Sequence, residues 1–295
     1  MSQFRSVGLM GRVGSAAVLE TLLHLRDLLR ARGLRVVVER EVAEHLDPAP
    51  GEVRGREDIG RDTDLVIVVG GDGSLLGAAR SLAPQNAPVL GVNRGRLGFL
   101  TDISPQQLEA QLDEVLAGRY LIESRFLLDV AVTRGDEVLA RGDALNDVVL
   151  NSGISARMIE FELYIEEQFV YTQRSDGLII STPTGSTAYS LSGGGPIMHP
   201  GLDALVLVPM FPHTLGSRPL VIHGSSSIRI VINEYNELHP TISCDGQLNI
   251  TASPGDMIHV HKKPEHLRLL HPLDHNFYDI CRAKLGWGSR PDGDE

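Results

Sequence analysis

The sequence predicts an α/β amino-terminal domain, an open and mostly parallel sheet with flanking helices, followed by a β-rich carboxy-terminal domain. Over residues 1–120, short apolar runs alternate with segments of helical periodicity, which is typical of a parallel sheet covered by helices. After residue 120 the apolar runs are short, several alternate apolar with polar residues, and turn signals such as Arg134-Gly135-Asp136 separate them. We therefore expect two domains, 1–120 and 121–274, with residues 275–295 able to pack back on the first.

The elements of the first domain follow from local patterns. Strands are expected at 4–10, 34–38, 65–69 and 89–92, where apolar residues run together. Between the first two, apolar residues recur at helical spacing from Val18 to Leu29, and Gly33 is placed to end that helix. Ser104-Pro105 predicts the start of a last helix ending at Gly118, with Ser104 as N-cap and Pro105 in the first turn.

The second domain is expected to be a β-sandwich or a twisted sheet. Its predicted strands are 127–132, 158–165, 169–172, 178–181, 205–209, 227–231 and 257–261. A weakly helical stretch at 279–285 follows, and we expect the last residues, 288–295, to be disordered.

Composition excludes several classes of protein. The formal net charge of −11 argues against nucleic-acid binding, because phosphate backbones require clustered Lys and Arg. No apolar run approaches the roughly 20 residues that span a bilayer. The two cysteines, Cys244 and Cys281, are too few for a disulfide framework. We therefore expect a cytoplasmic globular protein with no membrane partner.

A glycine-rich turn after the third strand is the first candidate site. Leu65 to Val69 runs into Gly70-Gly71-Asp72-Gly73-Ser74, and a helical pattern follows. Paired glycines let backbone amides approach a phosphate, and a helix N-terminus favours negative charge. A carboxylate would repel that anion unless it accepts a proton from an attacking hydroxyl or holds a bridging divalent cation, and both roles belong to phosphoryl transfer. The alternative is that Asp72 is a helix cap or a turn residue.

Three further stretches carry polar groups at the ends of predicted strands. Residues 93–98 form a second glycine-rich loop at the carboxyl edge of the sheet, where open α/β sheets bind ligands. Asn146-Asp147 sets an amide and a carboxylate before an apolar strand, a pair able to recognise hydroxyl and amino groups or to form a turn. Residues 176–196 are crowded with hydroxyls and glycines that could wrap a polar ligand.

Histidines gather late in the chain, at His259, His261, His266, His271 and His275. His259 and His261 would share a strand face, but no cysteine or carboxylate joins them at zinc-like spacing. We expect exposed strand and loop histidines here, and the residues leave the ligands of any metal unassigned.

Together these stretches resemble the NAD kinase family over nearly the whole chain. The segments at 70–74, 93–102, 146–147, 176–196 and 245–247 occur in the order and spacing of that family. The run from Thr182 to Tyr189 is the most specific part, because GGDG alone is shared with lipid kinases and phosphofructokinases. Arg96 stands where the family pattern has Asn, and Ser74 where it often has Thr.

The resemblance implies transfer of the ATP γ-phosphoryl group to the adenosine 2′-hydroxyl of NAD, giving NADP, with Mg²⁺ or another divalent metal. It implies a homodimer or homotetramer whose sites are completed by a neighbouring subunit. Asp72 matches the proton acceptor, and Gly70, Gly71, Gly73 and Ser74 form the phosphate loop. The residues implied to contact NAD are Asp72, Gly73, Asn146, Asp147, Arg157, Arg174, Asp176, Thr187, Ala188, Tyr189, Ser190, Leu191, Ser192 and Gln247.

Two other functions share some of these features. A lipid kinase of the diacylglycerol type has a GGDG loop, but the hydroxyl-rich run is a poor lining for an acyl chain. A non-catalytic dinucleotide sensor would keep the pocket, although binding alone gains nothing from a carboxylate beside phosphates.

Overall fold

The computed structural model describes the chain except for residues 1–3, 47–50, 96–97, 102, 154–156 and 288–295. The chain divides into two compact units. One comprises Met1–Ser124 together with Leu267–Glu295, and the other comprises Arg125–His266. The expected tail at 288–295 lies outside the described residues.

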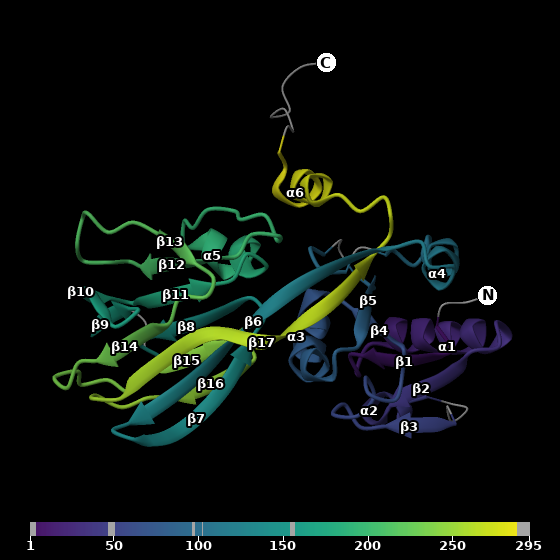
Figure 1. The fold of residues 1–295 in the computed structure, drawn as a ribbon, viewed down its shortest axis with the longest axis horizontal. Helices are drawn as coiled ribbons and strands as arrows, with labels where there is room; N and C mark the ends of the chain where they lie inside the picture. The colour runs from purple at the N-terminus through teal and green to yellow at the C-terminus, as the bar shows by residue number, and fades with distance from the viewer. Residues whose placement is uncertain (1–3, 47–50, 96–97, 102, 154–156, 288–295) are drawn as a thin grey trace, which may run out of the picture. The chain divides into compact units, whose positions relative to one another are not determined.

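The first unit contains a parallel sheet with helices on both faces (Figure 1). Its strands are β1 (Ser6–Gly11), β2 (Arg35–Glu39), β3 (Glu52–Arg54), β4 (Leu65–Gly70), β5 (Pro88–Asn93) and the end of β17 (Met257–His271). They pair in the order β17-β5-β4-β1-β2-β3, and every described pairing is parallel.

The helices of this unit are α1 (Ala16–Ala31), α2 (Arg40–Ala43), α3 (Asp72–Leu82), α4 (Leu108–Leu116) and α6 (Phe277–Leu285), with a short 3-10 turn, η1 (Ala83–Gln85). The apolar sides of α1 and α4 share one core with alternate residues of the strands, including Leu9 and Leu90. Gly91 points to the opposite face, where a Cβ would lie 3.0 Å from Leu75 of α3. Successive strand residues thus serve both faces of the sheet.

The second unit packs two sheets around one core. One sheet is antiparallel, with the order β13 (Leu220–His223), β12 (Ala204–Met210), β11 (Gly177–Ser181), β8 (Asp147–Asn151), β15 (Thr241–Cys244) and β16 (Leu248–Thr251). The facing strands are β9 (Ile159–Ile165), β10 (Gln168–Ser175), β14 (Ile228–Ile232), β17, β6 (Leu121–Arg134) and β7 (Glu137–Ala144). Leu150 and Ile180 of the first sheet share a buried cluster with Phe161 and Ile230 of the second.

Several predicted bounds were wrong. Helix α4 begins at Leu108 rather than at Ser104, because Ser104 opens a separate turn in which its carbonyl accepts from the amide of Gln107 at 3.1 Å. The predicted strand at 257–261 continues to His271, because pairing with neighbouring strands carries it through a polar stretch that lacks strand periodicity. Strands β3, β7, β13, β15 and β16 were not predicted. Half of the residues of β7 and most of those of β16 are exposed, so neither strand carries a strong apolar signal.

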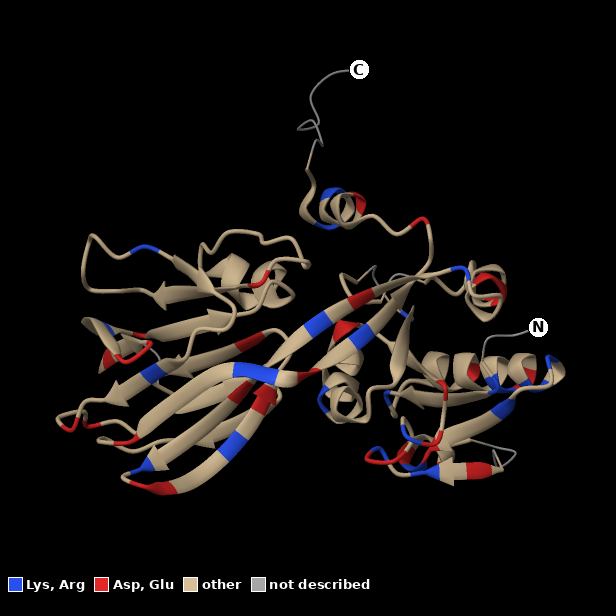
Figure 2. Cartoon of the chain, in the orientation of Figure 1, with Lys and Arg blue, Asp and Glu red and all other residues tan. Residues whose placement is uncertain are grey.

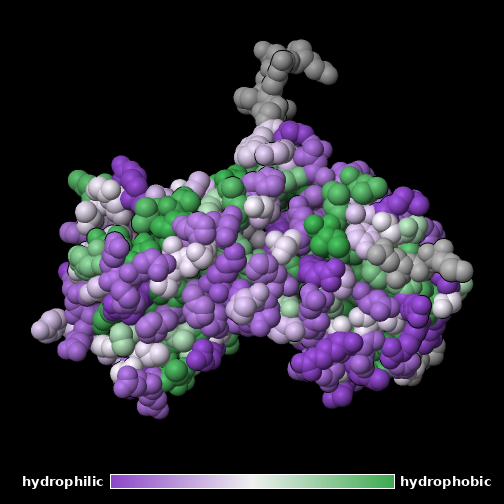
Figure 3. All heavy atoms as spheres, viewed as in Figure 1, coloured by the Kyte–Doolittle hydropathy of each residue, from purple (hydrophilic) through white to green (hydrophobic). Residues whose placement is uncertain are grey.

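Acidic and basic residues are interspersed along the elements of each unit (Figure 2). Several form ion pairs, such as Arg35 with Glu52 and Arg54 with Asp62. On the face shown in Figure 3, hydrophobic side chains reach the surface in groups among hydrophilic ones. None of the described helices has both the length and the apolar character needed to cross a membrane.

Candidate active site

The GGDGS turn connects β4 to α3 through a backbone that requires glycine. Gly70 has a φ of +156°, and a Cβ there would collide with the side chain of Ser74. Gly71 is the N-cap residue of α3, and the amide of Ser74 donates to its carbonyl at 2.9 Å. Gly71 and Gly73 are exposed, so the start of the helix is open to a ligand.

Asp72 is the first residue of α3, but its side chain does not cap the helix. Its Oδ2 accepts from the amide of Phe99 at 2.9 Å, and its Oδ1 accepts from the amide of Leu100 at 3.1 Å and the hydroxyl of Thr101 at 3.3 Å. A carboxylate has about four acceptor sites, so these bonds orient the group without using its full capacity. The alternative of a helix cap is therefore wrong for this side chain.

The loop after β5 supports this carboxylate. Gly98 packs directly on it, because a Cβ at Gly98 would collide with Asp72 Oδ1 and lie 2.6 Å from Thr101 Oγ1. The buried side-chain amide of Asn93 donates through Nδ2 to the backbone carbonyl of Thr101 at 3.1 Å and to its hydroxyl at 3.0 Å. The two glycine-rich loops of the first unit therefore meet at Asp72. Arg96, Leu97 and Asp102 of the expected segment lie outside the described residues.

A hollow of about 430 Å³ opens beside the same loop. Asn93, Arg94 and Gly95 line it from the loop side, and Ser104 lines it from the turn before α4. The backbone amide of Gly95 donates to Asn93 Oδ1 at 2.7 Å, which holds the rim in place. The carboxyl edge of this sheet is thus hollowed where open α/β sheets bind ligands.

In the second unit, the Asn146-Asp147 turn is held by the side chain of Asp245. The Asp245 carboxylate accepts from the amides of Leu145, Asn146 and Asp147 at 3.0, 2.7 and 3.3 Å. Asp245 itself has a φ of +53° in the turn between β15 and β16. The exposed Gln247 lies in the same turn, where its amide donates to the carbonyl of Cys244 at 3.0 Å.

Asp147 is buried at the start of β8. Burial raises the pKa of this carboxyl to about 7, and the negative charge of Asp245 adds to the rise. A carboxyl with this pKa can change its protonation near neutral pH, and a ligand that donates a hydrogen bond would favour its ionised form.

The hydroxyl-rich loop also packs on the Asn146 turn. The hydroxyl of Thr182 donates to the carbonyl of Leu145 at 2.6 Å, and its amide donates to the carbonyl of Asn146 at 2.9 Å. A Cβ at Gly185 would collide with Asn146, so only glycine permits this approach. The hydroxyls of Thr182 and Ser186 are buried and donate to backbone carbonyls, so part of the loop's hydroxyl content is structural.

The rest of this loop forms η2 (Gly185–Thr187) and α5 (Tyr189–Ser192). Tyr189 and Ser192 are exposed, while Thr187, Ala188 and Leu191 are half-buried. The loop is thus an ordered segment rather than a linker, and Tyr189 and Ser192 are its side chains most open to solvent.

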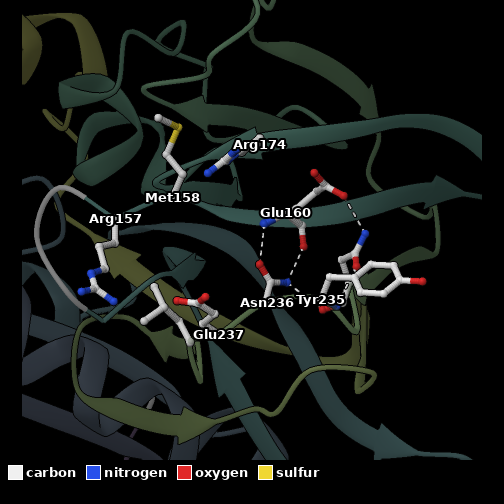
Figure 4. A pocket seen from close by; sticks show the side chains of 9 residues that line it. Arg157, Met158, Glu160, Arg174, Tyr235, Asn236 and Glu237 are labelled. Carbon is white, nitrogen blue, oxygen red and sulfur yellow. Dashed lines mark hydrogen bonds between the residues drawn. The ribbon is translucent and has the colours of Figure 1, made fainter.

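Arg157 and Arg174 share a polar hollow of about 530 Å³ (Figure 4). Glu160, Asn236 and Glu237 also line it, and Asn236 exchanges two hydrogen bonds with the backbone of Glu160, at 2.9 and 2.8 Å. A volume of this size is typical of small-molecule sites. Asp176 is not among the lining residues; its amide donates to the carbonyl of Met210 at 3.0 Å.

The expectation that the late histidines are all exposed was wrong. His271 is fully buried at the end of β17, and His266 and His275 are half-buried. His259 and His261 make separate contacts, with Thr133 at 3.2 Å and with Asp129 at 3.1 Å. The extension of β17 beyond residue 261 explains the burial of His271, because this end of the strand pairs with β5 in the sheet.

Sequence reasoning missed several residues that shape these sites. Gly98 and Thr101 hold Asp72, and Asp245 holds the Asn146 turn. The buried Arg125 donates to Thr184 Oγ1 at 3.3 Å beneath the hydroxyl-rich loop. Gly98, Thr101 and Asp245 lay in segments already singled out, at 93–102 and 245–247, although without these roles, and the signal of Asp245 was the Asp-Gly turn. Arg125 lay in none of those segments.

A carboxylate fixed at an open, glycine-rich helix N-terminus, on the carboxyl edge of a parallel sheet, is suited to phosphoryl transfer to a hydroxyl group. The fold and the site are thus those expected of a phosphotransferase. Comparison with known proteins identifies the family.

The ATP-NAD kinase N-terminal domain family matches residues 7–120, and the ATP-NAD kinase C-terminal domain family matches residues 145–271. The chain is 61% identical to the NAD kinase of Hahella chejuensis over 292 residues, which cover 99% of each chain. The chain therefore belongs to the ATP-NAD kinase family, and its activity is that of an NAD kinase, a phosphotransferase.

Solved structures agree with the observed fold. Yeast NADH kinase complexed with NADH superposes with a TM-score of 0.89 at 27% identity, covering 99% of this chain and 90% of that one. An NAD kinase from Archaeoglobus fulgidus in complex with ATP gives a TM-score of 0.71 at 23% identity, covering 94% and 99%. The predicted fold class is confirmed, and neither the lipid kinase nor the non-catalytic sensor is favoured.

Proposed function

We propose that the protein transfers the γ-phosphoryl group of ATP to the adenosine 2′-hydroxyl of NAD, producing NADP, with Asp72 as the proton acceptor. The observation that carries this proposal is the placement of Asp72 at the open start of α3, held by the amides of Phe99 and Leu100. A ribose hydroxyl is a poor nucleophile at neutral pH, so a fixed carboxylate that aligns it and takes its proton accelerates its attack on phosphorus.

The phosphate loop comprises Gly70, Gly71, Gly73 and Ser74. Its support is the exposure of Gly71 and Gly73, whose lack of side chains lets phosphate oxygens approach the helix N-terminus. Mg²⁺ would neutralise charge on the transferred phosphoryl group. The Asp72 carboxylate is an oxygen donor that fits Mg²⁺, but its described bonds go to amides and one hydroxyl. We therefore propose that the ion enters with the ATP phosphates.

The dinucleotide would be bound mainly by residues of the second unit. Asn146 and Asp147 present an amide and a carboxyl on a turn whose backbone is fixed by Asp245, and such a pair can recognise the hydroxyl and amino groups of a nucleoside. Arg157 and Arg174 supply two guanidinium groups to one hollow, which suits the phosphates of a dinucleotide. The remaining proposed contacts are Gly73, Asp176, Thr187, Ala188, Tyr189, Ser190, Leu191, Ser192 and Gln247.

We propose further that the protein is a cytoplasmic homodimer or homotetramer whose neighbouring subunits complete the dinucleotide site. Tyr189 and Gln247 are exposed on their loops, which leaves them available to a ligand that a second subunit also contacts. Cys244 and Cys281 are buried and neither forms a disulfide, as suits a reducing compartment. Activity should fall on dilution to monomers; a fully active monomer in sedimentation and assay would contradict this assembly.

The reaction is tested by incubating the protein with NAD, ATP and Mg²⁺ and measuring NADP with an NADP-specific dehydrogenase. We expect NADP to form in proportion to ADP. The 2′-deoxy analogue of NAD should bind but give no phosphorylated product, because the accepting hydroxyl is missing. Phosphorylation of that analogue would place the transfer on another hydroxyl and overturn the proposed chemistry.

A further inference from the structure

Three metal-ligating side chains converge in the first unit at a place that the kinase reaction does not use. Glu123 lies near the start of β6, His271 is the last residue of β17, and His275 lies in the turn that leads from β17 to α6 (yellow in Figure 1). Each offers one ligand atom, and these atoms all lie within 4.8 Å of one another. Glu123 and His271 are 148 residues apart, so the cluster exists only because the strands bring their ends together.

The spacing suits a tetrahedral zinc ion. Zinc binds imidazole nitrogen and carboxylate oxygen at about 2.0–2.2 Å, which places neighbouring tetrahedral ligand atoms roughly 3.3–3.5 Å apart. His271 Nε2 and Glu123 Oε2 are 3.4 Å apart, within this range. The His271 and His275 rings stack with centroids 3.8 Å apart and planes inclined by 26°. Two nearly parallel stacked rings cannot both hold one ion in their planes, so binding requires the His275 ring to rotate out of the stack and its ligand atom to move by up to about 1.5 Å.

The burial of the three groups supports a built site rather than a chance surface cluster. The His271 side chain has no exposed surface, His275 is half-buried, and the Glu123 side chain is 29% exposed. Two imidazoles with one carboxylate prefer zinc to Mg²⁺, which takes oxygen ligands in octahedral geometry. Three protein ligands leave one tetrahedral position for water, and the partial exposure of Glu123 gives that position a route to solvent.

We propose that Glu123, His271 and His275 bind one zinc ion, which ties the turn before α6 to the start of β6. With zinc bound, Glu123 and His271 would each coordinate the ion instead of contacting each other directly. Because the chain must be folded for these ligands to meet, the free energy of binding would stabilise the carboxy-terminal return to the first unit. The proposal is independent of the kinase reaction and adds a ligand that the reaction does not require.

The test is zinc binding by the full-length chain after its metals are removed. Zn²⁺ is titrated in competition with a chromophoric zinc chelator, with excess Mg²⁺ present to occupy oxygen-only sites. We expect one equivalent to bind. Glu123→Gln and His275→Asn should each lower the affinity for zinc by at least ~100-fold. Loss of a group that only supports a ligand would cost less, ~10–100-fold.

A matched control comes from another carboxylate–histidine pair of the same unit. Glu109 lies 3.1 Å from His24 on exposed side chains, and no third ligand joins that pair among the described residues. Glu109→Gln should therefore bind zinc as the natural chain does.

Thermal unfolding supplies a second readout. Zinc should raise the unfolding midpoint of the natural chain and of Glu109→Gln, but not that of Glu123→Gln. The proposal is overturned if the natural chain binds no zinc, or if Glu123→Gln and His275→Asn bind it as tightly as the natural chain. The proposal is also overturned if Asp129→Asn, which removes the carboxylate beside His261, abolishes zinc binding while Glu123→Gln does not.

Discussion

Replacing Asp72 by Asn tests the proton acceptor and its support together. The carboxylate accepts from the amides of Phe99 and Leu100 through different oxygens, at 2.9 and 3.1 Å. A carboxamide has one oxygen, so it can satisfy one of these amides while its own N–H₂ group faces the other. The substitution therefore removes the proposed proton acceptor and also leaves one backbone donor without its partner.

The two losses have different magnitudes and different observables. Removing a general base costs ~10²–10⁴-fold in rate, so kcat should fall by roughly 10²-fold or more. Leaving a partly buried amide unsatisfied costs about 1–3 kcal/mol, so the free energy of unfolding of the first unit should fall by that amount. We expect NAD to bind within a few-fold of the natural protein, because most of the proposed NAD contacts are residues of the second unit.

Thr101→Val separates the two effects. It removes the hydroxyl that donates to Asp72 at 3.3 Å and accepts from Asn93 at 3.0 Å, but it leaves both amide bonds and the carboxylate in place. The free energy of unfolding of the Thr101→Val variant should fall by about 1–2 kcal/mol, while its kcat stays within ~10-fold of the natural value.

The assays are NADP formation at saturating substrates, calorimetry with NAD, and urea unfolding. A near-normal kcat in Asp72→Asn would show that Asp72 only supports the loop. Equal losses of kcat in Asp72→Asn and Thr101→Val would assign the effect to loop position rather than to proton transfer.

Three further predictions concern neighbouring features. Gly98→Ala should lower kcat by about 10²-fold, since its Cβ would displace the Asp72 carboxylate, whereas Gly95→Ala, whose Cβ would lie 3.9 Å from its nearest neighbour, should stay active; equal kcat values for the two variants would contradict this. The pKa of the Asp147 carboxyl is raised to about 7 from 3.8. Between about pH 4 and 7, the folded protein therefore keeps a proton on Asp147 that the unfolded chain has already released. The free energy of unfolding should therefore fall with rising pH across that window by a few kcal/mol, and Asp147→Asn should lose this slope in urea unfolding; an unchanged slope would assign it to other groups. Arg174→Gly should change the preference between NAD and NADH more than the KM for ATP. An unaltered preference in steady-state kinetics would show that Arg174 does not set the choice between the oxidised and the reduced dinucleotide.

The sequence by itself determined the fold class and the chemistry-bearing segments. Hydrophobic periodicity reports which face of a helix or strand is buried, so the four central strands of the first unit and its first helix were found within a few residues of their bounds. The Gly70–Ser74 turn was readable because glycine is required where φ is positive and where a phosphate must approach the backbone. These signals are local, and local conformation is what a short stretch of sequence encodes.

Only the tertiary structure decided which distant groups meet. Asp72 is held by amides 27 and 28 residues further along the chain, and Asp245 binds the amide of Asn146 from 99 residues away. Glu123, His271 and His275 come together through strand ends that no spacing in the sequence connects. The physical reason is that such contacts depend on how whole strands and loops pack, and packing is set by the sum of many apolar contacts rather than by the residues that finally touch.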